Sequence, residues 1–238
     1  MSTAVLSPSP TIDVKSLKPM AMAESVLLFG IPAILLALSL WRLWPTLMDA
    51  GMTRPGAYVL SLSLVNAGLL IAALVGYRLE GNPWTWSAFA ARMRLTGMTA
   101  TIWLWAIGST LLFGVSALLI NSLAMTIYNV IGFSMPDLTS GVMTVWMHVI
   151  VLFFNIVGEE LWWRGYILPR QELTHGKITW LIHGTLWACF HMFKWWAVPF
   201  MLITCQIIPF VAQKTKNTWP GMINHIIING AGAIMAAM

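Results

Sequence analysis

Residues 142–166 read VMTVWMHVIVLFFNIVGEELWWRGY, a mostly apolar stretch that ends in two glutamates and an arginine. The stretch is longer than the roughly 18 apolar residues that separate a membrane-spanning helix from a buried helix of a soluble protein. Glu159, Glu160 and Arg164 are therefore predicted to lie inside a membrane helix. Each charged group costs at least ~2.5–3.5 kcal/mol to insert at a helix centre, so the cluster needs a function or partners that stabilise it.

The whole chain has the composition of a membrane protein. Of its 238 residues, 58% are hydrophobic and 9% are charged, whereas a soluble domain has about 25% charged residues. The apolar runs predict an all-α, polytopic transmembrane helical bundle of about seven spans, with six to eight possible. The predicted spans are 25–44, 57–77, 99–122, 142–164, 177–195, 196–213 and 218–237. Residues 1–23 are expected to form a polar N-terminal arm, because their prolines and lysines interrupt any apolar core.

Basic residues predict the orientation of the bundle, because cytoplasmic loops are enriched in lysine and arginine. Arg42, Arg54 and Lys194 fall on one side. The other side has ten of the thirteen basic residues, namely Lys15, Lys18, Arg78, Arg92, Arg94, Arg164, Arg170, Lys177, Lys214 and Lys216. We expect a multi-pass protein of the cell membrane with a cytoplasmic N-terminus and an external C-terminus. No run of basic residues indicates a nucleic-acid partner, and the sequence gives no indication of oligomeric state.

The two glutamates are expected to lie in different environments. Glu160 and Arg164 are four residues apart, so they share a helix face and are expected to form an ion pair. Glu159 points about a quarter-turn away, since each residue of an α-helix turns by roughly 100°. This leaves Glu159 free to hold a water or a proton, the position of a general base. The alternative is a structural ion pair near the cytoplasmic end of the helix, with Glu159 reaching the surface.

A polar stripe runs along the same helix, at spacings of four, seven and four residues, through Thr144, His148, Asn155 and Glu159. Asn155 is placed to hydrogen-bond to Glu159. His148 lies roughly 16 Å farther along the helix, too far to join the same site. We interpret His148 as a polar contact between helices.

The next predicted span has three aromatic or imidazole side chains on one face, His183, Trp187 and His191. His183 is interpreted as a histidine packed against another helix. A hairpin turning near residues 173–177 would place Glu159 roughly 20 Å and His191 roughly 21 Å from the turn. The two side chains are therefore expected at about the same depth.

The last predicted span has a polar pair on an otherwise apolar helix. His225 and Asn229 are four residues apart, and Gly221 precedes them on the same face. A glycine at this position allows close approach of a neighbouring helix. A lone His–Asn pair is also compatible with packing, but three helices that each present polar groups favour a common site.

Together these motifs resemble those of the CPBP family, whose members include CAAX prenyl endopeptidases and bacterial relatives linked to bacteriocin processing or immunity. The family pattern is Glu-Glu-x-x-x-Arg, aromatic-x-x-x-His and His-x-x-x-Asn, each on a separate membrane helix. Here these are Glu159 to Arg164, Trp187 to His191, and His225 to Asn229. The family usually has Phe where this chain has Trp187. The resemblance covers about residues 140–238, the expected catalytic core, and leaves 24–139 as N-terminal transmembrane helices.

The resemblance implies an intramembrane glutamic endopeptidase that acts without a metal or other cofactor. Glu159 would be the general base that holds the attacking water with His191. His225 and Asn229 would stabilise the oxyanion. The remaining motif residues, Glu160 and Arg164, would be the supporting pair. The implied substrate is a membrane-associated peptide or a lipidated, CAAX-type protein within the lipid bilayer.

Two alternatives stay open from the sequence. The first is a zinc peptidase with Glu159, His191 and His225 as ligands and a water in the fourth position, although the chain has no His-Glu-x-x-His helix. The second is a non-catalytic scaffold, bacteriocin-immunity protein or transporter that uses the same polar pocket, since mid-membrane charges also mark transport sites.

Overall fold

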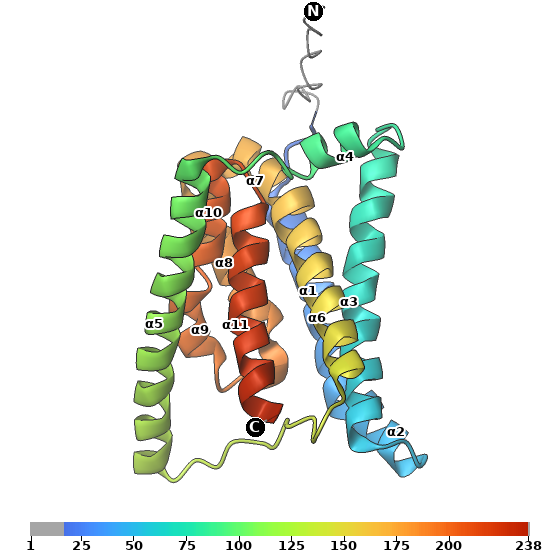
Figure 1. Cartoon of the computed structure of the whole chain (residues 1–238), viewed down its shortest axis with the longest axis vertical. Coiled ribbons are helices and arrows are strands. Elements are labelled where there is room, and N and C mark those ends of the chain that lie inside the picture. The colour runs from blue at the N-terminus through green and yellow to red at the C-terminus, as the bar shows by residue number, and fades with distance from the viewer. Residues whose placement is uncertain (1–16, 238) are drawn as a thin grey trace, which may run out of the picture.

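The computed structural model describes residues 17–237, and this part of the chain is a bundle of helices without a strand. The predicted all-α polytopic fold is confirmed. The first sixteen residues of the predicted polar arm lie outside the described residues. Figure 1 shows the helices side by side, with α4 and α7 at one end of the bundle and the loop between α5 and α6 at the other.

The elements follow one another with short connections. The N-terminal part consists of α1 (Met22–Leu38), η2 (Ser39–Leu43), α2 (Trp44–Asp49), α3 (Arg54–Leu79), α4 (Trp86–Arg92) and α5 (Ala100–Ile131). The C-terminal part consists of α6 (Val145–Glu159), η3 (Glu160–Ile167), α7 (Leu168–His175), η4 (Gly176–Ile178), α8 (Thr179–Phe190), η5 (Met192–Lys194), α9 (Val198–Thr204), α10 (Ile207–Thr215) and α11 (Trp219–Ala237).

Five helical segments of the described residues are long and apolar enough to cross a membrane: Met22–Asp49, Arg54–Leu79, Ala100–Ile131, Val145–Phe190 and Val198–Thr215. The segment Val145–Phe190 folds back at Gly176, whose positive φ of 58° suits glycine. The expected hairpin between the fourth and fifth spans is therefore present. α8 and the pair α9–α10 are both shorter than α5. They meet at a corner that does not reach as far as the end of α5 (Figure 1).

Threonine side chains begin four of the helices. Thr53, Thr85, Thr99 and Thr144 each accept a hydrogen bond from the backbone N–H three residues later, at 3.3–3.4 Å. These caps satisfy N–H groups that have no partner within the helix. Thr144 is thus the N-cap of α6, a role that the polar stripe of this helix did not indicate.

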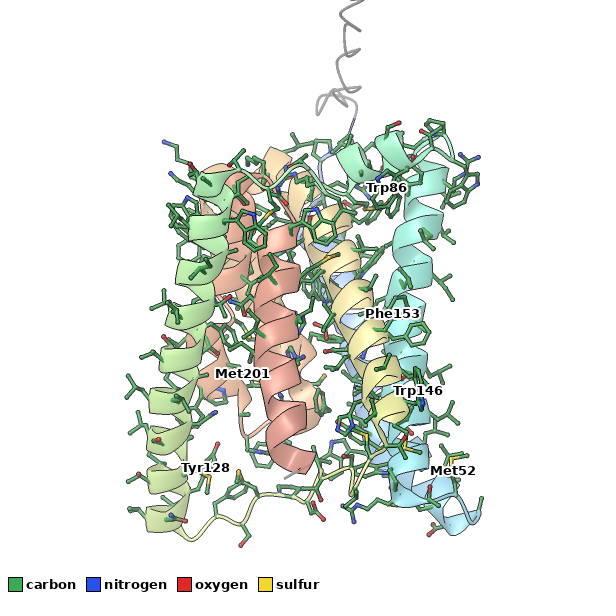
Figure 2. All side chains as sticks on the ribbon, viewed as in Figure 1. Met52, Trp86, Tyr128, Trp146, Phe153 and Met201 are labelled. Atoms are coloured by element: carbon green, nitrogen blue, oxygen red, sulfur yellow. The ribbon has the colours of Figure 1, made fainter. Side chains whose placement is uncertain are left out.

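Apolar side chains cover the outside of the bundle, which suits contact with lipid. Leu64, Leu104 and Leu118 are more than half exposed. Tryptophans are exposed toward both ends: Trp86 on α4 lies at one end, while Trp146 lies nearer the end that contains Met52 (Figure 2). Tryptophan is enriched at membrane interfaces, so this arrangement fits a protein with two interfaces to anchor.

The helix that carries the acidic pair is held closely by its neighbours. A Cβ at Gly158 would collide with the carbonyl oxygen of Asn66, so glycine allows α3 to approach α6. On the other side, Trp163 stacks on Phe29 of α1 with ring centroids 4.1 Å apart. Every residue of η3 is buried. The motif segment is therefore a packed core element and not a surface helix.

The short helix α4 stabilises one end of this segment. Arg92 is buried, pairs with Glu80 at 2.6 Å and donates to the carbonyl oxygens of Gly165 and Tyr166 in η3. The predicted cytoplasmic basic residues of the described chain lie at this end with α4 and α7, except Arg164, which is wholly buried. Arg164, like Arg92, is therefore buried in the protein and not exposed on a loop. The side of the membrane remains a prediction.

Candidate active site

The six predicted site residues come from three parts of the bundle. Glu159 ends α6, Glu160 and Arg164 lie in η3, His191 follows α8, and His225 and Asn229 lie on α11. Four of them, Glu159, His191, His225 and Asn229, line one cavity of about 510 Å³. Glu160 and Arg164 are buried behind its wall. The structure thus brings together the polar groups of the three motifs.

The cavity wall depends on both halves of the chain. Tyr58 of α3 and Phe113 and Asn121 of α5 contribute to the lining. At the far end from Glu159, the lining includes Ser140 and Gly141, which belong to the loop between α5 and α6. This loop lies at the opposite end of the bundle from α4 and α7 (Figure 1). The cavity therefore extends from the acidic pair toward that loop.

Glu159 is buried, and both of its carboxylate oxygens accept hydrogen bonds. Asn155 Nδ2 donates to Oε1 at 2.5 Å, as the four-residue spacing predicted. Trp187 Nε1 donates to Oε2 at 2.7 Å. Among the described residues, no lysine or arginine lies within ion-pair distance of Glu159. The carboxylate is thus free of the arginine, as expected, but two neutral donors fix its orientation.

A relay of amide groups connects Glu159 to α11. Because the Glu159 carboxylate accepts from Asn155 Nδ2, the Oδ1 of Asn155 points the other way. Asn229 Nδ2 donates to this Oδ1 at 2.7 Å. The second N–H of the Asn229 amide is not used in this relay, so it is a donor available to a ligand in the cavity.

Glu160 and Arg164 form the predicted pair, with 3.1 Å between Glu160 Oε1 and an Arg164 nitrogen. The guanidinium N–H groups do not point at the carboxylate with hydrogen-bond geometry. The guanidinium instead lies over the Trp187 ring, 3.8 Å from its centroid, a cation–π arrangement. Arg164 therefore contacts both Glu160 and the side chain that holds Glu159.

The same carboxylate oxygen of Glu160 also holds His225, whose Nδ1 lies 3.1 Å away. A carboxylate only accepts hydrogen bonds, so Nδ1 carries the proton in this contact. The other ring nitrogen, Nε2, is then the atom available to the cavity that His225 lines. A Cβ at Gly221 would collide with the Glu160 carboxylate. The absence of a side chain at Gly221 thus allows α11 to approach η3, in agreement with the sequence.

His191 is oriented by the backbone of its own helix. Its Nδ1 lies 2.8 Å from the carbonyl oxygen of Trp187, which can only accept, so Nδ1 carries the proton. In the neutral ring Nε2 then has a lone pair. His191 is half-buried and lines the cavity. Its ring therefore has the protonation pattern of a base for a molecule in the cavity.

The other two histidines of the motif helices behave differently. His183 is fully buried, contacts Gln171 Oε1 at 2.7 Å and packs edge-on against Phe29, which confirms the packed interpretation. His148 lies at the far part of the cavity lining. Its ring contacts the carbonyl oxygen of Thr144 in its own helix at 3.0 Å, and its contact with another helix stays a prediction.

Two residues with direct contacts to Glu159 were not among the predicted site residues. Asn155 had a signal, because it lies one turn before Glu159 on the polar stripe. Trp187 was predicted to share a helix face with His191 and was noted as a departure from the usual phenylalanine, but no contact with Glu159 was predicted. Its contact with Glu159 depends on how two helices are aligned, which the spacing within either helix does not give.

The zinc alternative requires three ligand side chains grouped around one point. Within the described residues, no three His, Cys, Asp or Glu side chains are grouped closely enough to hold a metal ion. Glu159, His191 and His225 line the same cavity but do not form such a group. The described residues therefore do not fit a three-ligand zinc site.

Comparison with known proteins agrees with these motifs. Residues 141–231 match the family model described as type II CAAX prenyl endopeptidase Rce1-like. No curated protein and no solved structure matches the chain. The matched region contains all six predicted site residues and the cavity wall formed by α6, α8 and α11. Over residues 141–231, the chain is therefore similar to the type II CAAX prenyl endopeptidases of this family.

Proposed function

We propose that this protein hydrolyses a peptide bond of a membrane-associated or lipidated substrate, with a water molecule activated by Glu159 and His191. The observation that carries the proposal is the convergence of four side chains on one cavity: Glu159 from α6, His191 from α8, and His225 and Asn229 from α11. These residues supply proton acceptors and hydrogen-bond donors, the two kinds of group that amide hydrolysis needs.

The first step is attack by water on the carbonyl carbon of the scissile peptide bond. The carboxylate of Glu159 takes a proton from the water, and the lone pair on His191 Nε2 accepts a hydrogen bond from the same molecule. The water oxygen bonds to the carbonyl carbon, whose oxygen becomes an oxyanion. The carbon–nitrogen bond then breaks, and the proton held by Glu159 passes to the leaving nitrogen.

The oxyanion is received by donors from α11. One donor is the second amide N–H of Asn229, whose first N–H goes to Asn155. The other is His225 Nε2, which donates when the ring carries both protons. Glu160, on the Nδ1 side of that ring, would then face both the imidazolium and Arg164. A single oxyanion donor is worth about 2.7–4 kcal/mol of transition-state stabilisation.

We also propose that the substrate enters from the end of the bundle that carries the loop at 132–144. The cavity lining reaches Ser140 and Gly141 of this loop. At the other end, η3 is fully buried, and Arg92 donates hydrogen bonds to two of its carbonyl oxygens. With the predicted cytoplasmic N-terminus, the entry side is external. This favours a membrane peptide or an exported peptide over a CAAX protein presented from the cytoplasm.

The test is a peptidase assay of the purified protein in detergent or nanodiscs, with lipidated and unlipidated peptides as substrates. Glu159→Ala and His191→Ala should abolish cleavage. His148→Gln is the matched control, because His148 lines the same cavity and its ring hydrogen-bonds to the Thr144 carbonyl oxygen of its own helix. Undiminished cleavage by both Glu159→Ala and His191→Ala would refute the mechanism.

A further inference from the structure

We propose that Trp187 is a positioning residue that orients both water-activating groups, Glu159 through its indole N–H and His191 through its carbonyl oxygen. The inference rests on the proposed function, because the orientation matters only if these two groups act on one water. It assigns a role to a residue that the motif pattern treats as a generic aromatic position.

The side chain of Trp187 provides the first contact. Its Nε1 donates to Glu159 Oε2 at 2.7 Å, and the residue is buried on α8. Asn155 donates to the other carboxylate oxygen. With one donor on each oxygen, the plane and direction of the carboxylate are determined. Each oxygen still has a lone pair that is not used in these contacts, and one of them is the acceptor for a proton from water.

The main chain of Trp187 provides the second contact. Its carbonyl oxygen accepts from His191 Nδ1 at 2.8 Å. This contact selects the neutral form of His191 in which Nε2 has the lone pair. The rings of Trp187 and His191 also meet edge to face, with centroids 5.5 Å apart. One residue therefore sets the direction of Glu159 and the protonated nitrogen of His191.

Arg164 packs over the indole ring of Trp187. Its guanidinium carbon lies 3.8 Å from the Trp187 ring centroid. Arg164 is wholly buried and pairs with Glu160. The supporting pair is thus connected to the general base by a chain of contacts from Glu160 through Arg164 and Trp187 to Glu159. A phenylalanine at position 187 keeps the ring for this stacking but has no N–H to donate.

A kinetic test separates positioning from packing. Trp187→Phe should lower kcat about tenfold to a hundredfold with little change in KM, since a hydrogen bond to a charged group contributes about 1.5–3 kcal/mol. Trp180→Phe is the matched control, because the Trp180 ring packs on Phe210 away from the cavity. In a Glu159→Asp background the shortened carboxylate no longer reaches the indole, so Trp187→Phe should cause less than about a twofold further loss.

A second test does not require activity. The indole N–H proton resonance of Trp187, identified by its loss in Trp187→Phe, should move upfield in Glu159→Gln and stay in place in Glu24→Gln. An unmoved resonance in Glu159→Gln, or full additivity of Trp187→Phe with Glu159→Asp, would overturn the inference. A moved resonance in a protein that cleaves no peptide would instead refute the proposed function and, with it, the positioning role.

Discussion

Asn229 Nδ2 lies 2.7 Å from Asn155 Oδ1, and this contact joins the last helix of the bundle to the helix that carries Glu159. The two amides belong to α11 and α6, which are separated by most of the C-terminal half of the chain. Because Asn155 also donates to Glu159, two hydrogen bonds connect Asn229, the proposed oxyanion donor, to Glu159, the proposed general base. The two chemical functions of the proposed site are thus physically coupled.

This coupling predicts that Asn155→Leu lowers kcat by about one to two orders of magnitude, because it removes a donor to a charged carboxylate. It also frees the Asn229 amide from its orienting partner. Steady-state cleavage kinetics would measure the loss. Asn121→Leu is the matched control, since Asn121 lines the cavity but makes no hydrogen bond to the described site residues. Equal kcat values for Asn155→Leu and Asn121→Leu would contradict the coupling.

The two glutamates are predicted to respond differently to loss of charge. Glu160 is wholly buried with Arg164 and His225, and breaking a buried ion pair typically costs about 3–5 kcal/mol. Glu160→Gln should therefore lower both activity and the unfolding temperature. Glu159→Gln should abolish activity with a much smaller change in unfolding temperature, because its described partners are neutral.

Thermal unfolding of the two purified variants in the same detergent would measure this difference. Arg164→Met removes the other charge of the ion pair, and its unfolding temperature should be lowered as in Glu160→Gln. Similar unfolding temperatures for Glu159→Gln and Glu160→Gln would show that the division into base and supporting pair is wrong.

Contacts within one helix could be predicted from spacing. The Glu160–Arg164 pair and the Asn155–Glu159 hydrogen bond both follow from a separation of four residues. The contact between Glu160 and His225 could not be predicted from spacing, because it depends on how α11 packs against η3. The walls supplied by Tyr58 and Phe113 come from the N-terminal helices, where the sequence has no recognisable motif.

The depth expectation from the sequence differs from the observed alignment of α8 with α6. It placed Glu159 level with His191 on the assumption of a regular α-helix. Residues Glu160–Ile167 instead form a π-helix, which has more residues per turn and covers less length. Glu159 therefore lies nearer the turn and contacts Trp187, one turn before His191. Single-turn π segments are frequent at functional sites.

The loop at the far end of the cavity is predicted to loosen in acid. Hydrogen bonds from the hydroxyl and backbone N–H of Thr139, followed by the nearby Arg54 guanidinium, hold the pKa of Asp137 below its ordinary value of 3.8. Because the pKa of Asp137 is lowered in the folded protein, its contacts stabilise the loop fully at pH values above the ordinary pKa. This stabilisation is lost as the pH falls through the lower pKa of the folded state.

A fluorophore on Ser140→Cys in a cysteine-free background would report this change. Its anisotropy should stay constant from pH 6 to about 4 and fall at lower pH. With Asp137→Asn added, anisotropy should be low at every pH, whereas Asp49→Asn should behave like the parent. A pH-independent anisotropy in the parent protein would show that Asp137 does not hold the loop.

The side of substrate entry is predicted to be external, which follows from the cavity lining and the basic-residue pattern together. In intact cells, a membrane-impermeant thiol reagent should label Ser140→Cys and, within the cavity, Asn121→Cys, after Cys189 and Cys205 have been replaced by serine. Lys177→Cys, at the α7 end of the bundle, should be labelled only after the cells are opened. Labelling of Lys177→Cys but not Ser140→Cys in intact cells would reverse the orientation. In that case the same cavity would face the cytoplasm, and a cytoplasmic CAAX-type protein would become the favoured substrate.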